Sequence, residues 1–156
     1  MHDIKDLETD AVIVGFHEDV RPLKGTAGAL DWLLCGALSH LIIQKKMRGV
    51  LGEVALLTSK GKVPADKIFM VGLGPRAVAS PESLRAAARV AAASSVNAGI
   101  ARAALDLFPA GAGQSDAALA AVREGLAEGA GVHTIDFTLL APDETAFERM
   151  SRLVQA

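Results

Sequence analysis

A run of apolar residues rich in valine and isoleucine at positions 11–16, Ala-Val-Ile-Val-Gly-Phe, most constrains what this chain can fold into. Continuous apolar runs of this length are typical of strands that are covered on both faces of a sheet. A loop containing Pro22 and Gly25 follows, and beyond it apolar residues recur at helical spacing. A buried strand that leads through such a loop into a helix predicts a layered α/β fold.

The alternation of apolar runs and helical patterns continues along the rest of the chain. Further strands are expected at residues 54–58, 67–71, 101–108 and 132–140. Helices are expected at about 26–47, from Ser80 to near Gly99, from Ser115 onward, and from Pro142 with Phe147, Met150, Leu153 and Val154 on one stripe. These elements predict a single α/β domain over residues 1–156, with three α/β/α layers and a mixed, mostly parallel central sheet.

The bulk composition narrows the class of protein. The chain has 156 residues, a formal net charge of −2 and one cysteine, so it offers no global attraction to nucleic acid and no internal disulfide. No signal peptide and no apolar stretch long enough to cross a bilayer is visible, and we expect a cytoplasmic location without a membrane partner. Basic residues could form a patch for nucleic acid, but one tryptophan and no tyrosine leave few stacking surfaces, and we expect no nucleic-acid partner.

Four segments, taken in this order, carry a family resemblance. They are Thr9-Asp10-Ala11, the helix opening from Gly25 to Leu38, Gly52-Glu53 before a strand, and Val71-Gly72-Leu73-Gly74. Over roughly residues 5–128 the chain resembles the amino-terminal domain of the leucine aminopeptidase (cytosol aminopeptidase) family. The resemblance implies a macrodomain-like fold.

The chain departs from that family after its third predicted helix. In the family a linker there leads into a metallopeptidase domain, in which an Asn-Thr-Asp-Ala-Glu-Gly-Arg motif with an upstream lysine and aspartates builds a two-metal site. That motif is absent here, and residues 132–156 supply a further strand and helix instead. The resemblance therefore implies a free-standing, non-catalytic interaction or regulatory domain that takes no metal cofactor and binds a protein partner or a second copy. A domain cut from a longer protein is the other interpretation.

A macrodomain-like fold also implies a candidate ligand cleft. Such folds bind ADP-ribose-like molecules at the carboxyl ends of their strands, where loop amides face phosphates. The corresponding positions here are Asp10, Gly15, Gly25, Thr26, Gly28, Gly72 and Gly74. However, Val14-Gly15-Phe16 replaces the Asn-Ala-Ala-Asn-type segment of many macrodomains, and the same glycines could simply form tight turns. Nucleotide binding is thus the alternative function.

The remaining candidates favour ordinary structural roles. Gly72 to Ala77 fits a dinucleotide-binding spacing, but Pro75 interrupts it and the helix is expected to start only at Ser80. His17, with Asp19 and His2, could suggest a metal cluster, yet His17 leaves a strand into a polar loop, where we expect a solvated side chain. Cys35 is surrounded by leucines, which predicts a small core residue instead of a reactive thiol.

Overall fold

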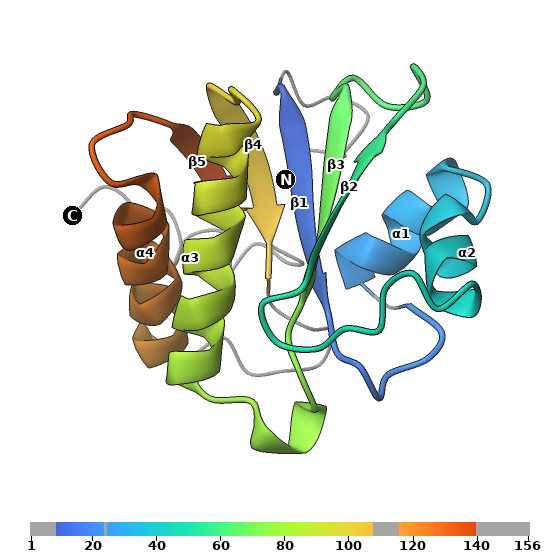
Figure 1. The fold of residues 1–156 in the computed structure, drawn as a ribbon, viewed down its shortest axis with the longest axis horizontal. Helices are drawn as coiled ribbons and strands as arrows, with labels where there is room; N and C mark the ends of the chain where they lie inside the picture. The colour runs from blue at the N-terminus through green and yellow to red at the C-terminus, as the bar shows by residue number, and fades with distance from the viewer. Residues whose placement is uncertain (1–8, 24, 108–115, 140–156) are drawn as a thin grey trace.

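The computed structural model describes residues 9–23, 25–107 and 116–139. Its centre is a sheet of five strands, in the order β2 (Val54–Thr58), β3 (Lys67–Gly72), β1 (Ala11–Phe16), β4 (Arg102–Asp106) and β5 (Asp136–Leu139) (Figure 1). β1 pairs in parallel with β3 and β4, β4 pairs in parallel with β5, and β2 alone is antiparallel to its neighbour β3. The predicted α/β fold with a mixed, mostly parallel sheet is confirmed.

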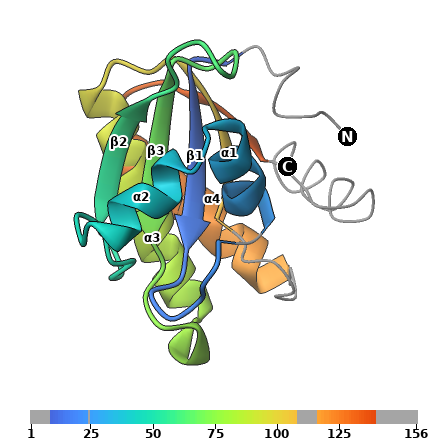
Figure 2. The ribbon, with the colours of Figure 1, turned by 90° about the vertical axis from the view of Figure 1, so that its right-hand side faces the viewer.

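Helices cover both faces of this sheet. α1 (Gly25–Leu33) and α2 (Ala37–Ile43) lie on one face, and α3 (Pro81–Asn97) and α4 (Asp116–Ala130) lie side by side on the other (Figures 1 and 2). A single 3₁₀ turn, η2 (Arg76–Val78), lies between β3 and α3. In the described part of the chain no single helix is long and apolar enough to cross a membrane, and only α1 and α2 together, bent by 105°, meet that test of length and composition.

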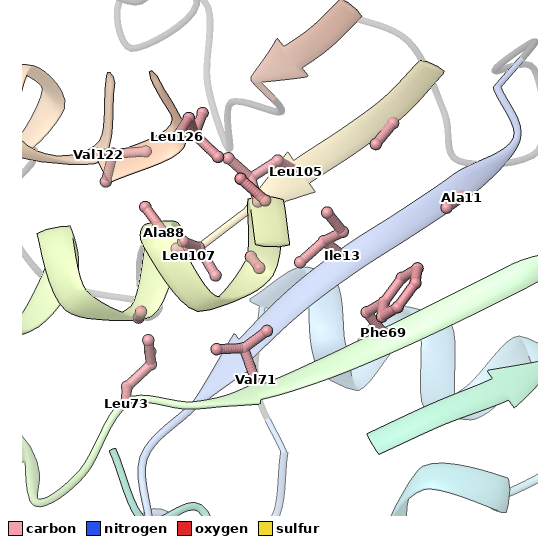
Figure 3. Packing of buried hydrophobic residues seen from close by; sticks show 14 of the residues in the cluster. Ala11, Ile13, Phe69, Val71, Leu73, Ala88, Leu105, Leu107, Val122 and Leu126 are labelled. Carbon is pink, nitrogen blue, oxygen red and sulfur yellow. The ribbon is translucent and has the colours of Figure 1, made fainter. Parts of the chain in front are cut away.

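The apolar run of β1 divides its side chains between two cores. Val12 and Val14 pack with the α1 and α2 layer, whereas Ala11 and Ile13 face α3 and α4 (Figure 3). All four side chains have 0% exposure. The period of two along a strand explains why every position of this run is apolar, because neither face of β1 meets solvent.

The single helix predicted at about residues 26–47 is wrong, because the chain breaks between α1 and α2. Cys35 and Gly36 have positive φ angles of 56° and 82°, which end the first helix. The Asp31 carboxylate then accepts hydrogen bonds from the Ser39 amide, at 2.9 Å, and from its hydroxyl, and so holds the turn. Leu34 and Leu38, on the two sides of the break, are both buried, so the apolar spacing could not show it.

The helix predicted from Ser80 is confirmed, with its cap. The Ser83 amide donates to Ser80 Oγ at 3.2 Å, and the Ser80 amide donates to Ser83 Oγ at 2.9 Å. β5 begins at Asp136, later than the predicted 132, because Gly131 makes a turn after α4 and Val132 is 97% exposed. The helix predicted from Pro142 lies outside the described residues.

Candidate functional site

Six of the seven predicted cleft residues lie near one edge of the sheet. β1, β3 and β4 are parallel, and their carboxyl ends Phe16, Gly72 and Asp106 lie at the same edge. Gly15, Gly72 and Gly74 belong to the ends of β1 and β3. Gly25, Thr26 and Gly28 open α1, which reaches this edge because Thr26 Oγ1 donates to Asp106 Oδ2.

Asp10, the seventh residue, is not brought to this group. It precedes β1, and its Oδ2 accepts from the amides of Ala101 and Arg102 at 3.1 and 3.0 Å. The whole length of β1 separates it from Gly15 and Phe16. Asp10 therefore joins the amino ends of β1 and β4, and its carboxylate is occupied by backbone donors.

The amides at the end of β3 are already hydrogen-bonded to backbone carbonyls. The Gly72 amide donates to the Glu53 carbonyl at 2.8 Å, Leu73 to Phe16 at 2.9 Å, and Gly74 to Gly49 at 2.9 Å. None of these three N–H groups remains to receive a ligand phosphate in this conformation.

The glycines at this edge also serve close packing. A Cβ added at Gly72 would overlap the backbone of Gly49 and Val50, and one added at Gly15 would lie 2.9 Å from Leu73 Cδ1. Glu53 fixes the covering segment, because its Oε1 accepts from the amides of Arg48 and Gly49 at 2.7 and 3.0 Å. Chain segments thus cover the space over Gly15 and Gly72.

His17 is buried, with 2% exposure, so the expected solvated side chain is wrong. Its Nδ1 lies 2.9 Å from the Gly74 carbonyl oxygen; because a carbonyl only accepts, Nδ1 carries the proton. Nε2 is buried with no hydrogen-bond partner among the described residues. In the sequence, only its position directly after a buried strand hinted at this role.

Asp19 is hydrogen-bonded to the backbone of η2. Its Oδ1 accepts from the Arg76 amide at 3.0 Å. This backbone hydrogen bond holds the pKa of Asp19 below its ordinary value, with smaller contributions from the charges of His17 and Arg76 against the opposing effect of desolvation. In the described ranges, no group of three or more histidine, cysteine, aspartate or glutamate side chains is arranged to hold a metal ion.

Sequence reasoning missed Asp106. This carboxylate ends β4, is 8% exposed, and accepts a hydrogen bond from Thr26 in the first turn of α1. Negative charge is stabilised beside a helix N-terminus, where the first amides of the helix are unpaired. The signal was an acid at the end of the otherwise apolar run Ala103 to Leu105.

Cys35 is exposed, which corrects the predicted core position. It lies in the turn after α1, next to a hollow that is also lined by Gly28, Asp31 and Trp32. Trp32 is the only tryptophan of the chain and is 80% exposed. The end of α1 and the turn after it therefore present an aromatic side chain and a thiol to solvent.

Comparison with known proteins assigns the family. The cytosol aminopeptidase family, N-terminal domain, matches residues 13–131. A "probable cytosol aminopeptidase" of Geobacter sulfurreducens is 34% identical over 120 residues, which cover 76% of this chain and 24% of that protein. One of Alkaliphilus oremlandii is 29% identical over 82 residues, or 53% of this chain and 16% of that protein. The chain thus spans about a quarter or less of these curated relatives.

Solved structures show the same fold at low sequence identity. A tomato leucine aminopeptidase mutant superposes with a TM-score of 0.69 at 19% identity, over 96% of this chain and 33% of that one. The Oceanobacillus iheyensis macrodomain with ADP superposes with a TM-score of 0.76 at 14% identity, over 99% of this chain and 87% of that one. The macrodomain-like fold is therefore confirmed, and the chain belongs to the cytosol aminopeptidase family, of which it represents the N-terminal domain.

Proposed function

We propose that this chain is a non-catalytic interaction domain of the cytosol aminopeptidase family, which works in the cytoplasm by binding a protein partner through the surface around Trp32. The observation that carries this proposal is the 80% exposure of that tryptophan. Tryptophan is enriched among the residues that contribute most to protein interfaces, and an exposed one has much apolar area to bury. Trp32 lies in the last turn of α1, and hydrogen bonds from Ser39 of α2 to Asp31 hold this end of the helix.

Trp32 is also the probe that tests this function. As the only tryptophan, it reports its own surroundings through its fluorescence. Emission should be that of a solvated indole at low concentration. It should shift to shorter wavelength when the chain is titrated with itself or with the Geobacter sulfurreducens aminopeptidase.

A matched variant separates this surface from exposed apolar residues in general. Trp32→Phe removes the fluorescence signal but keeps an apolar side chain, so association measured by sedimentation should persist. Trp32→Lys removes both the signal and the apolar side chain, so association should be lost. Val132→Lys changes an equally exposed residue elsewhere, at 97% exposure, and should leave association intact. An unshifted emission and a single monomeric species with both partners would refute the proposal.

The non-catalytic part of the proposal has its own test. Two-metal peptide hydrolysis needs converging carboxylates that bridge the metal ions and lower the pKa of a bound water. We expect no release of p-nitroaniline from leucine p-nitroanilide by the purified chain with added Zn²⁺ or Mn²⁺. A metal-dependent rate that co-purifies with the chain would contradict this expectation.

Binding of an ADP-ribose-like nucleotide is the second candidate function. It is favoured by the position of the α1 N-terminus at the carboxyl edge and by the likeness to the macrodomain with ADP. Against it, the Asp106 carboxylate beside Thr26 would repel a phosphate at the first turn of α1, and the amides of Gly72 and Gly74 are engaged.

Calorimetry with ADP-ribose distinguishes the two functions. The concentrations should detect a dissociation constant of about 100 μM, which corresponds to roughly −5.5 kcal/mol. We expect no heat from the unaltered chain. Heat that disappears in a Gly25→Glu variant would instead establish the ligand-binding function.

A further inference from the structure

β2 is the last strand at one end of the sheet, and in the described part of the chain no strand pairs with its outer side (Figure 2). In its antiparallel ladder with β3, residues alternate between hydrogen-bonded and non-hydrogen-bonded positions. The Ser59 amide donates to, and the Glu53 carbonyl accepts from, the backbone at the two ends of β3, at 2.9 and 2.8 Å. By this alternation the N–H and C=O groups that point away from β3 are those of Val54, Leu56 and Thr58. These groups form the open side of β2.

The open side of β2 lacks the residues that commonly keep strands from joining a sheet. Proteins often protect such strands with proline or with charged side chains. The sequence of β2, Val-Ala-Leu-Leu-Thr, contains neither. Leu56 is 51% exposed and shares a face with Val54, which packs against the α3 and α4 core. An apolar side chain therefore lies beside the unpaired backbone groups.

We propose that β2 binds an extended segment of another protein, which joins the sheet as a sixth, antiparallel strand. The outward N–H and C=O groups recur at every second residue, about 6.8 Å apart, which is the spacing of an extended partner backbone. Antiparallel pairing is the more stable arrangement per residue, and strand addition of this kind draws its affinity from main-chain hydrogen bonds. An apolar residue of the segment would lie opposite Leu56 and cover it.

The charges after β2 indicate what precedes the apolar residues of that segment. Lys60 and Lys62 are exposed in the turn between β2 and β3, which contains one acid, Asp66. An antiparallel partner would have its amino-terminal end beside this turn, because β2 ends there. Acidic residues at the amino-terminal end of the segment would complement the two lysines. The proposed partner is thus an extended apolar segment that follows one or two acids.

The small size of this surface favours a flexible segment over a second copy. β2 has five residues, which extend over about 17 Å. A two-fold pair of such strands would bring the two Leu56 side chains together and place Val54 opposite Thr58. Stable interfaces between folded proteins bury about 800 Å² on each partner, whereas transient contacts need less. A reversible contact with an extended segment therefore fits this surface better.

The peptide acetyl-Asp-Glu-Val-Thr-Ile-Thr-Val-amide tests the proposal against the unaltered chain. With its isoleucine opposite Leu56, the apolar residues of the peptide share the face of that side chain, and the isoleucine amide points toward β2. N-methylation of this amide should weaken binding by about tenfold, because a main-chain hydrogen bond is lost. N-methylation of the first threonine, whose amide points away from β2, is the matched control and should leave the affinity unchanged.

Amide NMR measures both the affinity and the position of the peptide. Titration to millimolar peptide should shift the signals of β2, and exchange of the Leu56 amide with solvent deuterium should slow by about tenfold or more at saturation. The Leu57 amide faces β3, so its exchange should not change with the peptide. This alternation between neighbouring amides distinguishes strand addition from binding through side chains alone.

Two substitutions of Leu56 test the same contact from the side of the protein. Leu56→Pro removes the outward N–H, and a strand at the end of a sheet tolerates proline where its N–H faces solvent. Leu56→Thr keeps the N–H. We expect peptide binding to be lost in the first variant and retained in the second, with urea denaturation confirming that both are folded. Trp32→Lys should bind the peptide like the unaltered chain, which separates this result from a failure of the Trp32 surface.

Several results would overturn the proposal. They are equal binding of the two methylated peptides, undiminished binding to folded Leu56→Pro, and no binding of the unmethylated peptide at millimolar concentration. Protection of the Leu56 amide that appears without peptide and grows with the concentration of the chain would also overturn it, since β2 would then pair with a second copy.

Discussion

The two helix layers of this domain solve the same packing problem in different ways. α3 and α4 are long, and they approach each other closely because Gly125 and Gly129 of α4 lie against the backbone of α3. Neither of them, over its described range, exposes a large apolar side chain. α1 and α2 are short, break at Cys35 and Gly36, and expose Trp32 and Ile43 at 80% and 75%. The α3 and α4 layer buries its large apolar side chains, whereas the α1 and α2 layer leaves two of them exposed to solvent.

Leu30 and Trp32 show this contrast within one helix and give the largest expected effect. Leu30 has 0% exposure, so Leu30→Ala should lower the free energy of unfolding by about 3 kcal/mol, through lost burial and a cavity. Trp32→Ala removes a larger side chain but should change it by less than about 0.5 kcal/mol, as for other exposed positions. Urea denaturation measures both. A stability loss at Trp32 that equals the loss at Leu30 would show that the tryptophan belongs to the core.

The substitution Gly125→Ala tests how closely α3 and α4 approach each other, because the sign of the change in unfolding free energy depends on the space between them. Alanine is the better helix former by about 1 kcal/mol, which alone would make Gly125→Ala stabilising. The new Cβ, however, would lie 2.8 Å from Ala88 Cβ and would also overlap the Arg85 carbonyl. We therefore expect a net loss of about 2 kcal/mol in unfolding free energy.

The reverse substitution on the same helix is the control for Gly125. Ala117 is exposed at the start of α4, so Ala117→Gly should lose at most about 1 kcal/mol through helix propensity alone. A gain in stability in Gly125→Ala would mean that the two helices have room between them. α3 and α4 would then not be in the close contact that distinguishes them from α1 and α2.

Removing the N-terminal cap of α3 should cause a smaller loss of stability. Ser80 Oγ accepts from the Ser83 amide, and α2 has no comparable cap, because its N-cap position is Gly36. Ser80→Ala should lower the unfolding free energy by about 1 kcal/mol. Ser80→Asp keeps an acceptor and should retain most of the stability. If Ser80→Ala and Ser80→Asp lose the same unfolding free energy, Ser80 does not stabilise the domain as a cap.

The smallest effect concerns the exposed ion pair between the two long helices. The hydrogen bond from Arg85, and then its positive charge, hold the pKa of Glu128 below the ordinary value of 4.5. A lowered pKa in the folded state means that ionised Glu128 adds stability above pH 4.5, which is lost as the pH falls through the lowered value. The Tm difference between the unaltered chain and Glu128→Gln should therefore be constant near neutral pH and shrink on acidification. A difference that persists in acid would come from packing and not from charge.

His17 and Cys35 show where prediction from the sequence ends. The strands and the α3 cap follow from local patterns, because apolar runs, proline and serine act through their neighbours in the chain. His17 was expected in solvent and is buried, since the segments around Gly49 and Gly74, far away in sequence, meet at the end of β1. Cys35 was expected in the core and is exposed, since left-handed residues break a helix whose apolar spacing continues.

The position of the candidate site could be predicted from the sequence. Whether its backbone amides are free or already hydrogen-bonded could not. Strand direction alone gathered Gly15, Gly25, Thr26, Gly28, Gly72 and Gly74 at one edge. The amides of Gly72 and Gly74 are occupied by the carbonyls of Glu53 and Gly49, which tertiary contacts bring to this edge. Asp10 lies at the far edge because it comes before β1.

The bonds around Gly74 bear on which parts of this domain can change independently. The Gly74 carbonyl accepts from the Glu18 amide at 3.2 Å and from His17, and its amide donates to Gly49. Three loops therefore share one residue, and a change of length in any of them disturbs the other two. An insertion or deletion in one of these loops should therefore also move the other two, whereas the exposed face of α1 around Trp32 shares none of these bonds and should tolerate substitution independently.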